Sequence, residues 1–126
     1  MTRPELSPEL RRFILTSIPS VPYLEAVLLL RGEPHREWDT AAAARRLYLP
    51  ETHTAELLQG LQDAGIALRG PAGLRYAPAT DELRTVIDQL AAHYAADLVG
   101  VTDLIHSRVD KKAQQFADAF RFRKDS

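Results

Sequence analysis

Apolar residues recur at intervals of three and four over most of the chain, which is the spacing of helices with one buried face. The first helix is predicted to begin after Ser7, an N-cap followed by proline, and to stop before Pro19. A second helix is predicted to begin at Ser20–Pro22 and to end at Arg31-Gly32, since a cation followed by glycine is typical of a helix C-terminus. The predicted buried positions of these helices are Leu10, Phe13, Ile14, Leu24, Val27 and Leu28.

Two shorter helices are predicted in the next stretch. Trp38 is expected in a short extended piece, and Asp39-Thr40 supplies an N-cap for an alanine-rich helix over residues 41–48. Leu49-Pro50 interrupts this helix and begins another, with the proline at its first position, which ends at Asp63–Gly65. The residues expected to be buried here are Ala43, Leu47, Ala55, Leu57, Leu58 and Leu61.

After these helices the apolar period changes from helical to alternating. The segments Ile66–Arg69 and Leu74–Ala77 both have the two-residue repeat of strands. Between them, Gly70–Gly73 has the composition of a turn. The pattern therefore predicts a β-hairpin.

The longest helical pattern runs through residues 79–107, with no proline inside it and a single glycine, Gly100, that would permit close contact with another helix. A helix of about 25 residues is roughly 37 Å long, which exceeds the core of a small three-helix domain. We therefore expect its far end to pair with a second copy of the chain, unless it folds back on the leading helix. The predicted dimer interface consists of Leu90, Tyr94, Leu98, Val101 and Ile105.

The last segment, residues 108–126, differs in composition from the rest. It holds six Lys and Arg against three Asp, a net charge of +3, and three of the four Phe residues. It is expected either to dock on the body as a terminal helix or to bind a partner, nucleic acid or protein, through its basic and aromatic side chains. The residues predicted to make that contact are Phe116, Phe120, Arg121, Phe122 and Arg123.

The order of helix, short strand, helix, turn, helix and hairpin is the organisation of a winged helix-turn-helix. The sequence thus predicts a mainly α fold with a small β-hairpin, followed by a long C-terminal dimerisation helix. Its parts are a leading helical segment (1–20), the winged helix-turn-helix domain (21–78), the dimerisation helix (79–107) and a basic, Phe-rich tail (108–126).

The segment Leu57–Ile66 resembles the end of a recognition helix in the winged-helix superfamily, and Arg69–Tyr76 resembles its wing. The resemblance covers Val21–Pro78, and the helix after it resembles the dimerisation helix of MarR-like and PadR-like bacterial transcriptional regulators. In DNA-binding members of the superfamily, the second helix of the motif enters the major groove and the wing contacts phosphates or the minor groove. The resemblance implies a dimeric transcriptional regulator whose DNA contacts are Arg45, Arg46, Thr52, His53, Glu56, Gln59, Arg69 and Arg75.

The charge distribution favours DNA less than the fold does. The 126 residues carry a net charge of -1, and residues 36–77 balance five Arg against five acids. The helix predicted to enter the major groove, called the reading helix below, has no Lys or Arg and contains Glu51, Glu56 and Asp63. Phosphate contacts supply most of the affinity for DNA, so one such winged-helix domain would bind weakly by itself. The winged-helix domains of two chains (the heads of a dimer) would bind one duplex together. The alternative is a winged-helix adaptor that binds another protein through its head or its Phe-rich tail.

Other classes of function have little support in the sequence. It contains no cysteine, nucleophile elbow, Walker loop or dinucleotide-binding glycine pattern, so we expect neither an enzyme nor a cofactor. The pairs His93/Asp97 and Asp103/His106 have helical spacing, but a metal site needs three or four ligands, so exposed polar positions are expected instead.

Since no apolar run reaches membrane-spanning length and the N-terminus lacks signal-peptide features, we expect a cytoplasmic protein without a membrane partner.

Overall fold

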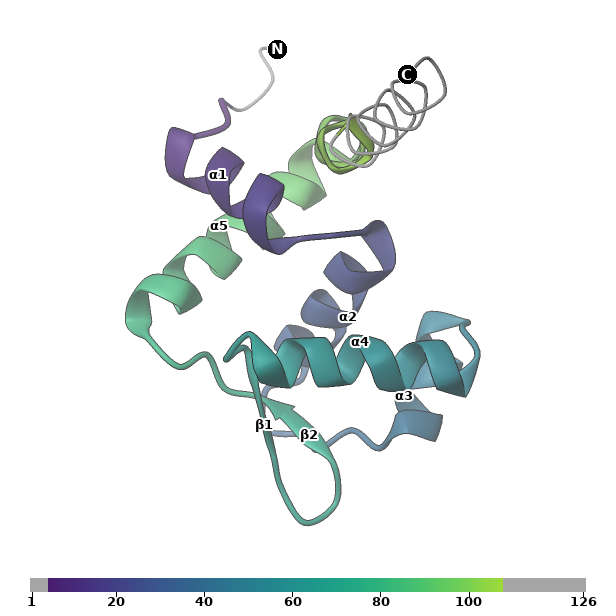
Figure 1. Cartoon of the computed structure of the whole chain (residues 1–126). Coiled ribbons are helices and arrows are strands. Elements are labelled where there is room, and N and C mark those ends of the chain that lie inside the picture. The colour runs from purple at the N-terminus through teal and green to yellow at the C-terminus, as the bar shows by residue number, and fades with distance from the viewer. Residues whose placement is uncertain (1–4, 108–126) are drawn as a thin grey trace, which may run out of the picture.

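The computed structural model describes residues 5–107, in which helices pack around one core and a hairpin closes its lower side (Figure 1). A further helical stretch covers residues 98–107. The elements, in chain order, are α1 (Pro8–Ser17), α2 (Val21–Gly32), α3 (Thr40–Leu47), α4 (Glu51–Asp63), β1 (Ala67–Arg69), β2 (Leu74–Tyr76) and α5 (Asp81–Ala96).

Side-chain caps determine where four of the helices begin. The hydroxyl oxygen of Ser7 accepts a hydrogen bond from the backbone N–H of Leu10 at 3.1 Å, and Ser20 caps α2 in the same way. The Asp39 carboxylate accepts from the N–H of Ala42 at 2.7 Å and so begins α3. Each cap satisfies an N–H that has no partner inside its helix. The helix starts predicted at Ser7, Ser20 and Asp39 are confirmed. Thr80 begins α5 by the same kind of bond.

Helix α2 lies at the centre of the molecule and contacts α3, α4 and β2. Four of its side chains are completely buried: Leu24, Ala26, Val27 and Leu30. Because α2 is covered on several sides, its apolar residues are not confined to one stripe.

The hairpin pairs β1 with β2 in antiparallel register, with Leu68 opposite Arg75. A third short piece joins it, because Trp38 donates its backbone N–H to the Leu74 carbonyl at 2.8 Å and accepts from the Leu74 N–H at 2.9 Å. Gly73 makes this approach feasible, since a Cβ there would lie 2.2 Å from the Trp38 carbonyl oxygen. The hairpin and the extended piece at Trp38 are confirmed, and the fold is a winged helix-turn-helix.

Helix α4 differs from the sequence prediction at two positions. Pro50 is its N-cap rather than its first helical residue. Ala55 is exposed and Thr54 is completely buried, so the prediction of a buried Ala55 is wrong. The Thr54 hydroxyl donates to the Pro50 carbonyl at 3.0 Å, and a hydroxyl satisfied within its own helix can face the core at low cost.

The predicted single helix over residues 79–107 is wrong, because α5 ends at Ala96. Asp97 has φ -146° and ψ 68°, outside the helical region, and its Oδ1 accepts a hydrogen bond from the Gly100 N–H at 3.1 Å. Asp97 therefore caps the start of the stretch 98–107, which turns away from α5 (Figure 1). The atoms nearest to a Cβ on Gly100 would be those of this carboxylate and not those of another helix, so within residues 5–107 the close helix contact predicted at Gly100 is not observed.

The apolar stripe of this C-terminal region folds back on the leading helix, the second of the two outcomes that the sequence allows. Helix α1 packs against α5, and Leu10 and Ile14 share one core with the predicted dimer-interface residues. Of those five residues only Leu98 is exposed, at 54%; the buried ones are Leu90, Tyr94, Val101 and Ile105. The predicted tail contacts Phe116, Phe120, Arg121, Phe122 and Arg123 lie outside the described residues.

Within residues 5–107, no single helix has the length and apolarity to cross a membrane. Helices α1 and α2 would reach that length only together, and they meet at a bend of 112°. Both contribute side chains to the core.

Candidate nucleic-acid interface

Helix α4 has one side in the core and one side in solvent. Its buried positions are Thr54, Leu57, Leu58 and Leu61. The solvent side carries all four residues predicted to read bases, which are Thr52, His53, Glu56 and Gln59. The structure thus brings them together on one exposed helix surface. Gln59 is already engaged there, because its Nε2 donates to Asp63 Oδ1 at 2.8 Å.

The hairpin places a cation beside this surface. Arg69 donates from Nε to Gln62 Oε1 at 3.2 Å, which ties the end of β1 to α4. Arg75 is exposed on β2, opposite the exposed Leu68. Neither arginine forms an ion pair with an acid in the described part of the chain. Both guanidinium groups therefore keep donors available for phosphate oxygens.

The two arginines at the end of α3 are in different situations. Arg46 Nη1 lies 3.6 Å from Glu33 Oε2, and its guanidinium is 5.4 Å from the centre of the Trp38 ring. Arg36 contacts the same carboxylate oxygen at 3.4 Å and stacks on the same ring at 3.6 Å. Arg45 is exposed and has no acidic partner among residues 5–107. Of the two, Arg45 is the one whose charge is not offset by an acid.

Glu37 holds the tip of the hairpin. Its Oε2 accepts a hydrogen bond from the backbone N–H of Ala72 at 3.2 Å, and its carboxylate lies against Gly70. A Cβ on Gly70 would overlap that carboxylate. The residues alone predict no role for Glu37; its position directly before Trp38, which pairs with β2, is the signal that could have indicated one.

A second feature missed in the sequence is Tyr48, at the turn between α3 and α4. It was predicted to end the third helix, and its backbone does cap α3 in the left-handed conformation. Its side chain is 93% exposed, the highest value among the exposed large apolar residues of the described chain.

Negative charge is concentrated at the start of the solvent side of α4. Glu51 and Glu56 are both exposed there, and α4 contains no Lys or Arg. Arg45 lines a hollow together with Glu51 at the start of α4, Arg69 contacts Gln62 near the end of α4, and Arg75 lies on β2. An exposed polar helix with an arginine near each end is chemically able to contact phosphates as well as base edges.

No family model matches the chain, and no curated protein matches it in sequence. Among solved structures, the chain is similar to a MarR family protein from Mycobacterium tuberculosis, with a TM-score of 0.49 and 19% sequence identity. The match covers 93% of this chain and 84% of the other. The winged-helix assignment itself comes from the observed order and pairing of the elements.

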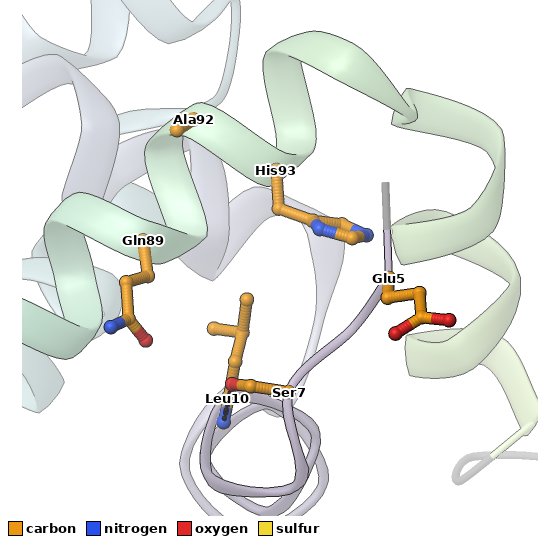
Figure 2. Close-up of a pocket in the computed structure, with 6 residues that line it drawn as sticks. All are labelled: Glu5, Ser7, Leu10, Gln89, Ala92 and His93. Atoms are coloured by element: carbon orange, nitrogen blue, oxygen red, sulfur yellow. Dashed lines mark hydrogen bonds between the residues drawn. The ribbon is translucent and has the colours of Figure 1, made fainter. Parts of the chain in front are cut away.

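A separate hollow of about 300 Å³ lies between α1 and α5. Figure 2 shows His93 extending from α5 toward Glu5, with Leu10 between the helices. Ser7 lines the same hollow, but its hydroxyl is used as the cap of α1. Among residues 5–107 no group of three His, Cys, Asp or Glu side chains could hold a metal ion.

Proposed function

We propose that this protein is a winged-helix transcriptional regulator that binds duplex DNA. The observation that carries the proposal is the 3.2 Å hydrogen bond between Arg69 and Gln62, which fixes a cation of the wing next to the exposed side of α4. An exposed polar helix flanked by a basic hairpin fits a major groove and the neighbouring phosphates.

In this proposal the contacts divide by chemistry. Thr52, His53 and Gln59 offer neutral donors and acceptors to base edges, and Glu56 accepts from the amino group of cytosine. The wing arginines and Arg45 contact phosphates, which supply most of the affinity but no sequence preference. Arg46, predicted as a fourth basic contact, would have to leave Glu33 first.

A homodimer is part of the same proposal, because a head with three acids on its reading helix binds DNA weakly by itself. Four of the five predicted interface residues lie in the core of the chain. The proposed interface therefore centres on Leu98 and its neighbour Val99, which are 54% and 58% exposed. Two heads on one duplex add their binding free energies, apart from the cost of joining them.

Fluorescence anisotropy with labelled duplex DNA at several salt concentrations tests the proposal. A DNA-binding protein loses affinity linearly on a log–log plot against salt. Arg69→Ala and Arg75→Ala should each weaken binding and lower the slope by about 1, since each removes one phosphate contact. Arg12→Ala, an exposed arginine on α1, is the matched control and should leave binding unchanged. No affinity at low salt would contradict the proposal.

A second candidate function is that of an adaptor that binds another protein. The exposed Glu51 and Glu56 on α4 favour it, together with the Glu33 carboxylate, which offsets part of the positive charge of Arg36 and Arg46. An acidic helix surface suits a basic protein partner better than a phosphate backbone. The two candidates separate in the salt titration, because an adaptor shows no affinity for duplex DNA at any salt concentration.

A further inference from the structure

Tyr48 projects into solvent from the turn that joins α3 to α4. Its side chain is 93% exposed, so it packs against almost nothing in its own chain. The other large apolar side chains that are exposed, such as Leu68 and Leu98, each cover about half of their surface. A tyrosine contributes to folding mainly by burial, and Tyr48 gains almost none of that contribution.

The backbone of Tyr48 makes the choice of residue more unusual. With φ 58° and ψ 43° it is left-handed, and it is the one non-glycine residue with positive φ in the described chain. Its N–H donates to the Ala44 carbonyl and thereby ends α3, a position where glycine or asparagine is favoured. The cap needs the backbone conformation only. Neither capping nor packing therefore requires a tyrosine side chain at this position.

The surroundings of Tyr48 are suited to a phosphate. A shallow hollow between the end of α3 and the start of α4 is lined by Tyr48, Arg45 and small apolar residues such as Ala44. Arg45 is exposed and has no acidic partner among residues 5–107. Glu51 also lines the hollow and repels an anion from the first turn of α4, so a phosphate is favoured on the Arg45 side.

We infer that Tyr48 is a contact to the DNA backbone, with its phenol O–H donating a hydrogen bond to a phosphate oxygen that Arg45 also binds. This inference rests on the proposed function and adds a residue to it. Tyrosine hydroxyls are among the common donors to DNA phosphates. The turn lies directly before the helix proposed to enter the groove, which is where the flanking phosphates run.

The contact differs from an arginine contact in its salt dependence. A cation that binds a phosphate releases a counterion, whereas a neutral hydroxyl releases none. Loss of the Tyr48 hydroxyl should therefore weaken binding by the same factor at every salt concentration. Loss of Arg45 should weaken it most at low salt.

Salt-dependent anisotropy with the full chain tests this inference. Tyr48→Phe is expected to weaken binding to duplex DNA about 3- to 10-fold with an unchanged salt slope. Arg45→Ala should lower the slope by about 1. Arg12→Ala on α1 is again the control for loss of an exposed cation. Tyr48→Gly, which suits the positive φ, should bind no more tightly than Tyr48→Phe.

The outcomes distinguish the inference from the proposed function. If Tyr48→Phe and Tyr48→Gly both bind like the wild type while Arg75→Ala is weaker, the protein binds DNA and the Tyr48 contact is wrong. If only Tyr48→Gly is weaker, the ring makes the contact and the hydroxyl bond is wrong. If both Tyr48 variants change the molar mass in light scattering but not DNA affinity, the residue belongs to a protein interface. No DNA affinity in the wild type overturns both ideas.

Discussion

At the scale of single residues, the fold leaves some polar side chains with a free donor or an unpaired charge and engages others, and the proposed DNA contacts depend on the first group. Arg45 is exposed without an acidic partner in the described chain, whereas Arg46 is engaged by Glu33 and Trp38. Arg45 and Arg46 are adjacent in the sequence, and the helical pattern gives no reason to distinguish them. A carboxylate 13 positions away decides between them, because it lies beside one guanidinium and not the other.

The strain at Tyr48 predicts an effect on stability that is opposite to its effect on binding. Tyr48→Gly is expected to raise the free energy of unfolding by about 0.5–1 kcal/mol, since glycine adopts positive φ without the steric cost that a Cβ brings. Urea denaturation followed by circular dichroism measures this change. A fall of 1 kcal/mol or more would show that the ring stabilises the folded chain after all.

Tyr94 predicts a pH dependence of stability. Burial and the hydrogen bond that it donates to Glu25 at 2.7 Å raise its pKa from 10.0 to about 12. The folded state therefore favours the protonated phenol, and this stabilisation is complete below pH 10 and is lost as pH rises toward 12. Burial also raises the pKa values of Tyr23 and Tyr76.

The contribution of Tyr94 is isolated by comparing the wild type with Tyr94→Phe in urea titrations between pH 8 and pH 12. The free energy of unfolding should fall more steeply with pH in the wild type, because the variant retains Tyr23 and Tyr76 but lacks the phenol beside Glu25. Equal slopes in the two proteins would contradict the assigned cause.

At the scale of elements, the C-terminal helices show how one side chain divides a continuous pattern. Leu83, Leu90 and Ile105 all fit a single helix. The chain nevertheless leaves the helical region at Asp97, and the cap that Asp97 provides to Gly100 begins the next helical stretch. This break allows both stretches to pack on the core formed by α1 and α2 instead of extending as a rod.

Removal of this cap should destabilise the protein. Asp97→Ala is expected to lower the free energy of unfolding by about 1 kcal/mol, the usual cost of losing an N-cap. Asp103→Ala is the matched control, because Asp103 is an exposed acid within the same helical stretch. Chemical denaturation of both variants measures the difference, and equal stabilities would show that the cap does not hold the break.

At the scale of the whole molecule, the proposed function depends on how two heads are joined. The core of one chain already buries most of the stripe that the sequence offers for dimerisation, including Leu90 and Ile105. Leu98 and Val99 form the exposed remainder. This pair is small compared with a stable interface, which buries about 800 Å² on each partner, so further residues would have to contribute to a dimer.

Light scattering at micromolar concentration tests the dimer. The expected mass is twice the 14.1 kDa of one chain. Leu98→Lys should shift the population toward the monomer, because it places a charge in the proposed apolar contact. Leu68→Lys, on the hairpin and equally exposed, is the control and should leave the mass unchanged. A wild type that stays at 14.1 kDa would exclude a dimer as the DNA-binding form at that concentration.

The sequence by itself determined the features that depend on neighbouring residues. Ser7 and Asp39 fix helix starts by local hydrogen bonds, and Gly65, with φ 75°, follows the end of α4. The alternation around Gly70–Gly73 likewise specified the hairpin. These signals act over a few bonds of the chain, so the element order, and with it the winged helix, could be predicted.

The tertiary structure decided what depends on contacts between distant residues. It buried Thr54 instead of Ala55 and ended α5 at Ala96. It also paired Arg46 with Glu33 and left Tyr48 in solvent. Periodicity shows only that a face is apolar, whereas the surface that covers this face depends on the packing of the whole chain. For the same physical reason, the sequence pattern alone does not show which of the residues proposed to contact DNA are exposed and unpaired, because this depends on how the helices and the hairpin pack.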